Sequence, residues 1–443
     1  MKKPELLSPA GTLKNLQYAV AYGADAVYAG LPRYSLRVRN NEFDLETMAA
    51  AIQDLHKAGK RLHAVANIQP HNSKLKTFVR DMGDLIALGP DALIMSDPGL
   101  IMMVRESFPD VPIHLSVQTN TINFASVKFW ERQGIKRIIL SRELSLDEIA
   151  EIRQQCPDIE LEVFIHGALC MAYSGRCLLS GYLNHRDSNQ GACTNACRWK
   201  YTLHPAREDS AGDLVIANGN QDPDIGLGPV TDRSYFITEP GRPEEPMPAE
   251  EDVHGTYIMN SRDLCAVRHV KRLTEIGIDS LKIEGRTKSF YYCARTANIY
   301  RKAIDLAVQG EEVTPEILAE VNTLANRGWT DGFLARHPIQ DYQNYEWGNS
   351  VTDGSQVVGE VLDIEEDGTA KIAVRNRFDA GDRIEILTPG KSFFMTANAI
   401  FEKGVPVSSA LGDGHTVTMK TPARPENARF ALIVRLPKEQ ASA

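Results

Sequence analysis

The alternation of two kinds of segment constrains the fold of this chain more than any other feature. Across residues 1–165, a short apolar or β-branched run is followed by a polar or glycine-containing loop and then by an amphipathic stretch. This pattern predicts strands that alternate with helices. Eight such strands indicate a TIM-like (β/α)8 barrel, and a doubly wound sheet is the main alternative. The predicted strands begin at Glu5, Asp25, Arg61, Ala92, Ile113, Arg137 and Leu161, with an eighth at Asp279.

Polar side chains follow the predicted strands at the ends where such a barrel builds its site. Any one of them could simply cap a loop, but together they predict a site at the carboxyl-end face. Alternation along the eighth strand sends Lys282, Glu284 and Arg286 to the same side, where they either face the site or form a structural charge network. The residues at these strand ends are Ser8, Gly30, Asn67, Ser96, Asp97, Ser116, Gln118, Asn120, Ser141, Arg142, Glu143, His166, Lys282, Glu284 and Arg286.

Two regions depart from the alternation. An insertion at 167–257 separates the seventh and eighth strands, and its acidic, proline-bearing part at 208–252 predicts loops or short hairpins. Near the C-terminus, short alternating runs are separated by turn signals, and these predict a small all-β barrel. We therefore expect a catalytic barrel domain over residues 1–345 and a C-terminal β-barrel domain over residues 351–443.

The composition excludes several classes of protein. Of the 443 residues, 43% are hydrophobic and 24% are charged, and no run approaches the ~20 apolar residues of a membrane span. The N-terminal residues lack the apolar region of a signal peptide, so we expect a cytosolic location. The formal net charge of −9 argues against a general nucleic-acid coat. Any binding of RNA must therefore be local.

The cysteines point to a metal cofactor. Their number, seven, is odd, which argues against a disulfide framework in a chain of this kind. Four are spaced C-x6-C-x15-C-x3-C, and this uneven spacing favours an iron-sulfur cluster, because a cubane accepts ligands from unrelated directions. Structural zinc and unligated thiols stay open as alternatives. The four are Cys170, Cys177, Cys193 and Cys197. The other three, expected to be buried as small hydrophobes, are Cys156, Cys265 and Cys293.

The local charge inverts around the four cysteines. Between Cys170 and Arg207, arginine and lysine residues alternate with tyrosine and tryptophan. Single-stranded RNA requires phosphate pairing and base stacking, so Arg198 and Lys200 are candidate RNA contacts, with a solvated face as the alternative. A second basic loop, RYSLRVR, follows the second strand and would place Arg37 at the same barrel mouth.

Several segments of the chain resemble those of one family. They are EVFIHGALCMAYSGRCLLSGYLNHRDSNQGACTNACRWKY, LLSPAG, GADAVYAG, SRDLC, DSLKIEGRTKS and NRGWTDGF. They resemble the collagenase-like U family of unclassified peptidases, whose relatives include RNA and ubiquinone hydroxylation proteins. Despite the peptidase label, the resemblance implies an oxygen-independent hydroxylase with a [4Fe-4S] cluster on Cys170, Cys177, Cys193 and Cys197. For members that act on tRNA it implies prephenate as hydroxyl donor and 5-hydroxyuridine at the wobble position as product.

These implications assign roles to the residues at the barrel mouth. Prephenate carries two carboxylates, so its site needs cations, for which the candidates are Arg37, Arg142, Lys282 and Arg286. Glu284 or His166 could move protons. Two alternatives are a collagenase-like peptidase and a non-catalytic RNA-binding adaptor that contains zinc. The chain has neither an HExxH nor a GxSxG motif, which disfavours the peptidase.

Overall fold

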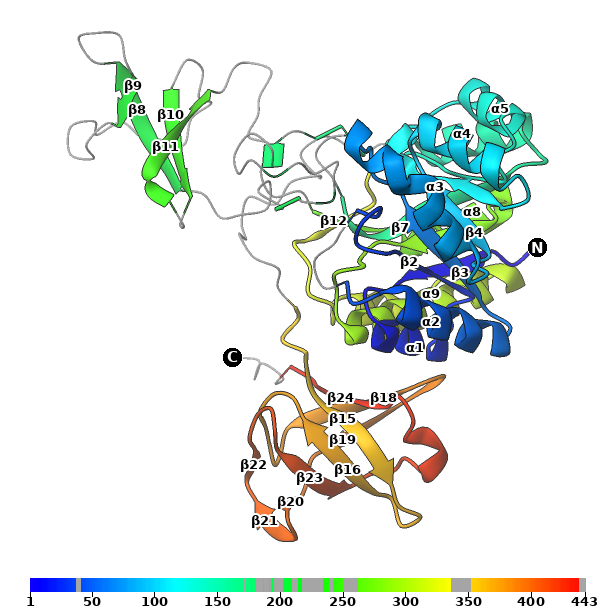
Figure 1. Ribbon diagram of the computed structural model, residues 1–443. Helices are drawn as coiled ribbons and strands as arrows, with labels where there is room; N and C mark the ends of the chain where they lie inside the picture. Colours follow the sequence, from blue (N-terminus) through cyan, green and yellow to red (C-terminus); the bar gives the residue numbers. More distant parts are fainter. Residues whose placement is uncertain are drawn as a thin grey trace.

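The computed structural model describes most of the chain (Figure 1). The described residues are 1–36, 41–169, ten positions from 173 to 194, four strands between 202 and 250 as backbone, 262–335 and 352–437. Within these residues, no helix combines the length and the apolar character needed to cross a bilayer.

Eight parallel strands close a barrel. Each strand from β1 to β7 pairs with the next, and β13 pairs in parallel with both β7 and β1, which closes the ring. The predicted TIM-like barrel is therefore confirmed, and the open doubly wound sheet is not adopted. The strands are β1 (Glu5–Pro9), β2 (Ala26–Ala29), β3 (Arg61–Ala66), β4 (Ala92–Met95), β5 (Ile113–Leu115), β6 (Arg137–Ile139), β7 (Glu160–Ala168) and β13 (Ser280–Ile283).

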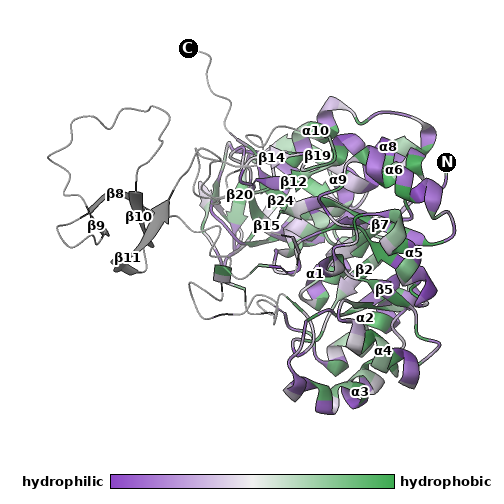
Figure 2. Cartoon of the chain, turned by 90° about the horizontal axis from the view of Figure 1, so that it is seen from above, coloured by the Kyte–Doolittle hydropathy of each residue, from purple (hydrophilic) through white to green (hydrophobic). Residues whose placement is uncertain are grey.

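Amphipathic helices surround the barrel, as the alternation predicts. Most begin at a side-chain cap, such as Asp44 or Ser145, which satisfies free backbone N–H groups of the first turn. Figure 2 shows both hydrophobic and hydrophilic residues along these helices. They are α1 (Leu13–Ala21), α2 (Leu45–Lys57), α3 (Asn72–Ile86), α4 (Pro98–Ser107), α5 (Phe124–Arg132), α6 (Leu146–Gln155), α8 (Val270–Ile276), α9 (Phe290–Gln309) and α10 (Pro315–Val321).

Two short strands and the end of one helix differ from the sequence-based expectation. The strand β12 (Asp263–Cys265) pairs antiparallel with β7, and β14 (Trp329–Thr330) pairs parallel with β12. The periodic segment 315–328 ends in glycine and predicts a helix that reaches Gly328, but α10 ends at Val321. The Asn326 side chain bonds to nearby backbone groups, accepting from Gly328 N at 2.9 Å, and such local bonds compete with helical ones.

The inserted segment contains more regular structure than expected. Its backbone forms a four-stranded antiparallel sheet in the order β11-β10-β8-β9. The pair β10–β11 is a short hairpin of the kind that was predicted within the acidic segment. The strands are β8 (Thr202–Glu208), β9 (Leu214–Ile216), β10 (Ser234–Glu239) and β11 (Arg242–Glu250).

The C-terminal region is all-β, as predicted. Eight strands form one antiparallel sheet from β19 to β21, and these two edge strands do not pair with each other in the described part of the chain. The strands in spatial order are β19 (Lys391–Thr396), β18 (Arg383–Thr388), β24 (Leu432–Arg435), β15 (Gln356–Ile364), β16 (Thr369–Val374), β23 (Thr416–Lys420), β20 (Ile400–Glu402) and β21 (Val405–Val407). A separate pair consists of β17 (Phe378–Asp379) and β22 (Ser409–Ala410).

The C-terminal region packs on helices α1 and α9 of the barrel (Figure 1). Tyr22, the C-cap residue of α1, donates its hydroxyl hydrogen toward the carbonyl oxygens of Leu387 and Phe430, at 2.8 and 2.9 Å. Arg295 of α9 is 1% exposed and forms a two-pronged ion pair with Glu385 of β18. A buried ion pair of this kind fixes the relative position of the two regions.

Candidate active site at the barrel mouth

Arg142 joins three strand ends at the barrel mouth. Its Nη1 donates to the carbonyl oxygen of Ala168 at 2.9 Å, and its Nη2 lies 3.3 Å from Oε2 of Glu284. Its guanidinium also lies 3.9 Å from the centroid of the Phe164 ring. Because Arg142 follows β6, Ala168 ends β7 and Glu284 follows β13, Arg142 brings together groups at the ends of three barrel strands.

Arg286 approaches the same place from the loop after β13. It is 6% exposed, donates to the carbonyl oxygen of Leu36, and its guanidinium carbon lies 5.9 Å from the centroid of the Tyr28 ring. The Leu36 backbone N–H in turn donates to Asn67 Oδ1 at 3.1 Å. Arg286 therefore connects the site to Leu36, in the basic loop that follows β2.

Amide and hydroxyl side chains complete the mouth. Asn67 and Gln118 bond to each other twice, through Asn67 Nδ2 to Gln118 Oε1 at 2.8 Å and through Gln118 Nε2 to the Asn67 carbonyl at 2.7 Å. Ser116 donates to Gln118 Oε1 at 2.6 Å, and Ser96 to the Asn67 carbonyl at 2.9 Å. These bonds fix the ends of β3, β4 and β5 relative to one another.

Lys282 lies below the mouth, in the interior of the barrel. It is 3% exposed, its Nζ is 2.8 Å from Oε1 of Glu162, and it lies 4.2 Å from the centroid of the Tyr28 ring. Glu162 is 0% exposed and also accepts from Arg137 at 3.1 Å. The three charged residues predicted on one side of the eighth strand are therefore separated. Lys282 belongs to an interior network, whereas Glu284 and Arg286 lie at the mouth.

The charges on Glu162 and Lys282 stabilise each other. Burial alone would raise the pKa of Glu162, but Lys282 and Arg137 outweigh burial and hold it at about 2. Burial lowers the pKa of the Lys282 ammonium, although Glu162 opposes this change. The sequence-based interpretation omitted Glu162 and Tyr28, although strand alternation places both on the inward side.

His166 has an environment unlike that expected of a proton carrier at the mouth. Its Nδ1 lies 3.2 Å from the Tyr300 hydroxyl, and its ring centroid lies 5.0 Å from that of Trp329. The imidazole is 1% exposed, and burial lowers its pKa to about 3. The ring is therefore neutral at ordinary pH, held between β7, α9 and β14.

Two of the four clustered cysteines are described, Cys177 and Cys193, and both are half-buried. Three residues after Cys177, the buried Ser180 hydroxyl lies 2.8 Å from that of Thr194 and accepts from its backbone N–H at 2.9 Å. The two cysteine-bearing stretches are thus bonded together. Thiolates on stretches held side by side fit an iron-sulfur cluster as its donor set.

Several predicted residues lie outside the described part of the chain. Among the described residues, no group of three or more His, Cys, Asp or Glu side chains could hold a metal ion. Of the basic segment, Arg176 and Arg186 are described and are exposed. The three buried thiols expected as small hydrophobes, Cys156, Cys265 and Cys293, are confirmed as buried. The predicted residues that are not described are Arg37, Cys170, Cys197, Arg198 and Lys200.

The fold and site belong to a known class of protein. The profile of peptidase family U32 matches residues 11–344, and that of the peptidase family U32 C-terminal domain matches residues 353–435. The chain is therefore a member of peptidase family U32 with its C-terminal domain, which confirms the resemblance noted in the sequence.

Relatives within this family carry functional names. The chain is 58% identical over 441 residues to tRNA hydroxylation protein P of Escherichia coli, covering 98% of this chain and 97% of that protein. It is 57% identical over 443 residues to the protein of the same name in Haemophilus influenzae, covering 98% and 96%. It is 31% identical over 305 residues to the 23S rRNA 5-hydroxycytidine C2501 synthase of E. coli, covering 69% and 40%.

Proposed function

We propose that this protein is a tRNA-modifying enzyme that hydroxylates the wobble uridine to 5-hydroxyuridine. In this proposal prephenate donates the hydroxyl group without molecular oxygen, and a [4Fe-4S] cluster is bound by Cys170, Cys177, Cys193 and Cys197. Two relatives of nearly equal length that are named for tRNA hydroxylation support the substrate class. The relative named as a hydroxycytidine synthase supports the type of reaction.

The observation that carries the proposal is the contact between the mouth cluster and the start of the cysteine segment. Arg142 binds the carbonyl oxygen of Ala168, two residues before Cys170, while its other arm pairs with Glu284. A substrate at the mouth would therefore lie beside the cysteine segment. When bound there, an iron-sulfur cluster supplies one-electron transfer.

The cations at the mouth suit a donor with two carboxylates. Arginine binds a carboxylate through two parallel N–H groups, and both Arg142 and Arg286 hold planar guanidiniums at this end of the barrel. Glu284 pairs with Arg142 and keeps its arm aimed at the mouth. Lys282 contributes in this proposal through Glu162, as a positioning charge beneath the site.

Peptidase chemistry finds little support in the described residues. Cys265 of β12 lies opposite His166 of β7 in register, and the Tyr300 hydroxyl contacts both side chains. Burial raises the pKa of the Cys265 thiol to about 11 and lowers that of His166 to about 3. A catalytic cysteine needs the opposite shifts, toward a thiolate and a charged imidazole.

The first test is the nucleoside content of tRNA from cells that lack the protein. We expect mass spectrometry to show loss of 5-hydroxyuridine at the wobble position, with recovery on expression of the wild-type chain. Expression of Arg142→Gln should fail to restore it, because misplacement of reacting groups by about 1 Å can reduce a rate by roughly 10²-fold. Exposed Arg132, in the last turn of α5, provides the matched control Arg132→Gln, which should restore the product. Unchanged wobble-uridine hydroxylation in the deletion strain would contradict the proposal.

The cluster is tested by iron and sulfide analysis of protein purified without oxygen. Cys177→Ser and Cys193→Ser should each lose most of the iron, because a hydroxyl is a poor ligand for this soft site. Cys156 is a buried thiol that precedes β7 in the sequence, and Cys156→Ser should retain the wild-type iron content. A colourless wild-type protein with one zinc ion would instead favour the RNA-binding adaptor.

A further inference from the structure

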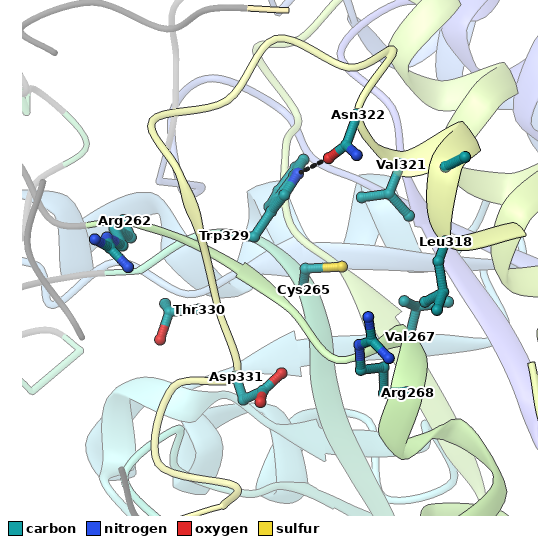
Figure 3. A pocket seen from close by; sticks show the side chains of 11 residues that line it. Arg262, Cys265, Val267, Arg268, Leu318, Val321, Asn322, Trp329, Thr330 and Asp331 are labelled. Atoms are coloured by element: carbon teal, nitrogen blue, oxygen red, sulfur yellow. Dashed lines mark hydrogen bonds between the residues drawn. The ribbon is translucent and has the colours of Figure 1, made fainter. Parts of the chain in front are cut away.

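A pocket lies beside the barrel mouth and shares no lining residue with the mouth cluster of Arg142, Glu284 and Arg286. Its volume is about 420 Å³, within the range of roughly 300–1,000 Å³ of typical ligand sites. β12, β14, the turn after β12 and helix α10 form its walls (Figure 3). The side chains that line it are Arg262, Cys265, Val267, Arg268, Leu318, Ala319, Val321, Asn322, Trp329, Thr330 and Asp331.

The register of β12 places this pocket next to the cysteine segment. Asp263 pairs with Ala168, so Arg262 lies beside the residues that lead into Cys170. The Ala168 carbonyl is also the group that Arg142 holds at the barrel mouth. The pocket and the mouth are thus neighbours at the end of β7.

Trp329 gives the pocket a fixed aromatic wall. Its Nε1 donates to Asn322 Oδ1 at 3.2 Å, and its ring packs at 5.0 Å against His166, measured between centroids. The indole remains half-buried and lines the pocket. In Figure 3 it stands between Arg262 on one side and Cys265 on the other. Aromatic faces held in this way are platforms for nucleic-acid bases.

Two arginines lie on opposite sides of the indole (Figure 3). Arg268 is exposed, and the structure shows no ion pair to it within its described part. Arg262 is partly buried, and its Nε, which is fully buried, has no hydrogen-bond partner among the described residues. Asp331 also lines the pocket, 3.4 Å from His269 Nε2. Its carboxylate can accept a hydrogen bond from a ribose hydroxyl.

We infer that this pocket binds one nucleotide of the RNA substrate, outside the reacting centre. The base stacks on Trp329, and Arg262 and Arg268 pair with the phosphates on its two sides. Cations on both sides of an aromatic platform match a polymer with a phosphate before and after each base better than a small ligand with one anionic end. This inference rests on the proposed function, since it takes tRNA as the substrate.

The test measures binding of unmodified tRNA transcript to the full-length, cluster-loaded protein at several salt concentrations. Arg268→Gln should lower affinity roughly 5- to 8-fold at 0.1 M salt and reduce the salt slope by about one, as expected for one lost phosphate contact. Trp329→Leu should weaken binding by about 5- to 150-fold with the slope unchanged, because stacking involves no counterion release. Trp329→Phe keeps an aromatic face and should retain most of the affinity.

Separate controls test whether each variant is folded and whether the protein binds tRNA at all. Each variant's thermal midpoint and iron content are measured, and Arg132→Gln is the charge-matched control that should bind like wild type. Wild-type affinity and salt slope in both Arg268→Gln and Trp329→Leu would overturn the pocket assignment alone. Failure of the wild-type protein to bind tRNA at all would overturn the proposed function as well.

Discussion

Replacing Arg295 by methionine is expected to lower the free energy of unfolding by about 3–5 kcal/mol. The substitution removes the partner of Glu385, which is 3% exposed, and leaves its carboxylate buried at the junction of the barrel and the C-terminal region. Ser392 still donates to Glu385 Oε1 at 2.7 Å, but one neutral hydrogen bond does not replace a guanidinium. Urea unfolding curves of the full chain measure the effect.

Two further variants distinguish the contribution of the Arg295–Glu385 ion pair to stability from that of side-chain packing. Lys302→Met removes a partly exposed partner of Glu320, at 2.7 Å, and should cost at most about 1 kcal/mol. The double variant Arg295→Met with Glu385→Leu removes both buried charges and should recover much of the lost stability, because no unpaired charge remains. A loss as large in the double variant as in Arg295→Met would show that shape, and not charge, holds the two regions together.

The periodicity of the sequence was enough to predict the barrel, because the hydrophobic pattern of each strand and helix is visible in a short stretch of consecutive residues. All eight barrel strands occur where the apolar runs predict them. β12 could not be found in this way, since it has three residues and its pairing with β7 depends on the closed barrel. The end of α10 at Val321 was also missed, because within the remaining part of the periodic segment the Asn326 side chain bonds to the backbone of Leu324 and Gly328.

The sequence predicted which strand ends contribute to the candidate site, but it did not predict how deeply each side chain lies in the barrel. Arg142 pairs with Glu284 at the mouth, and Arg286 lies on the same loop as Glu284, as their positions after the sixth and eighth barrel strands imply. How deeply a side chain lies in the barrel depends on the register between neighbouring strands. Lys282 precedes Glu284 by two residues, and its side chain lies inside the barrel beside Glu162. His166 departs from simple alternation because the pairing of β7 with β13 shifts between Lys282 and Ile283.

Lys282→Met should destabilise the barrel by about 3–5 kcal/mol, because it leaves Glu162 in the interior with one cation fewer. Lys2→Met provides the matched control. It makes the same chemical change at a lysine that is 74% exposed and pairs with Asp279 at the surface, and it should cost at most about 1 kcal/mol. Thermal and urea unfolding of both variants give the comparison.

The pH dependence of stability identifies the cause of this loss. The pKa of Glu162 is about 2 in the folded chain against 4.5 for an ordinary glutamate, so its contribution is present above pH 4.5 and is lost as the pH falls towards 2. Without Lys282 the folded pKa of Glu162 rises, and acid unfolding of Lys282→Met should begin at a higher pH than that of wild type or Lys2→Met. An unchanged acid transition in Lys282→Met, with tRNA product lost and the thermal midpoint retained, would instead assign Lys282 to the binding of the hydroxyl donor.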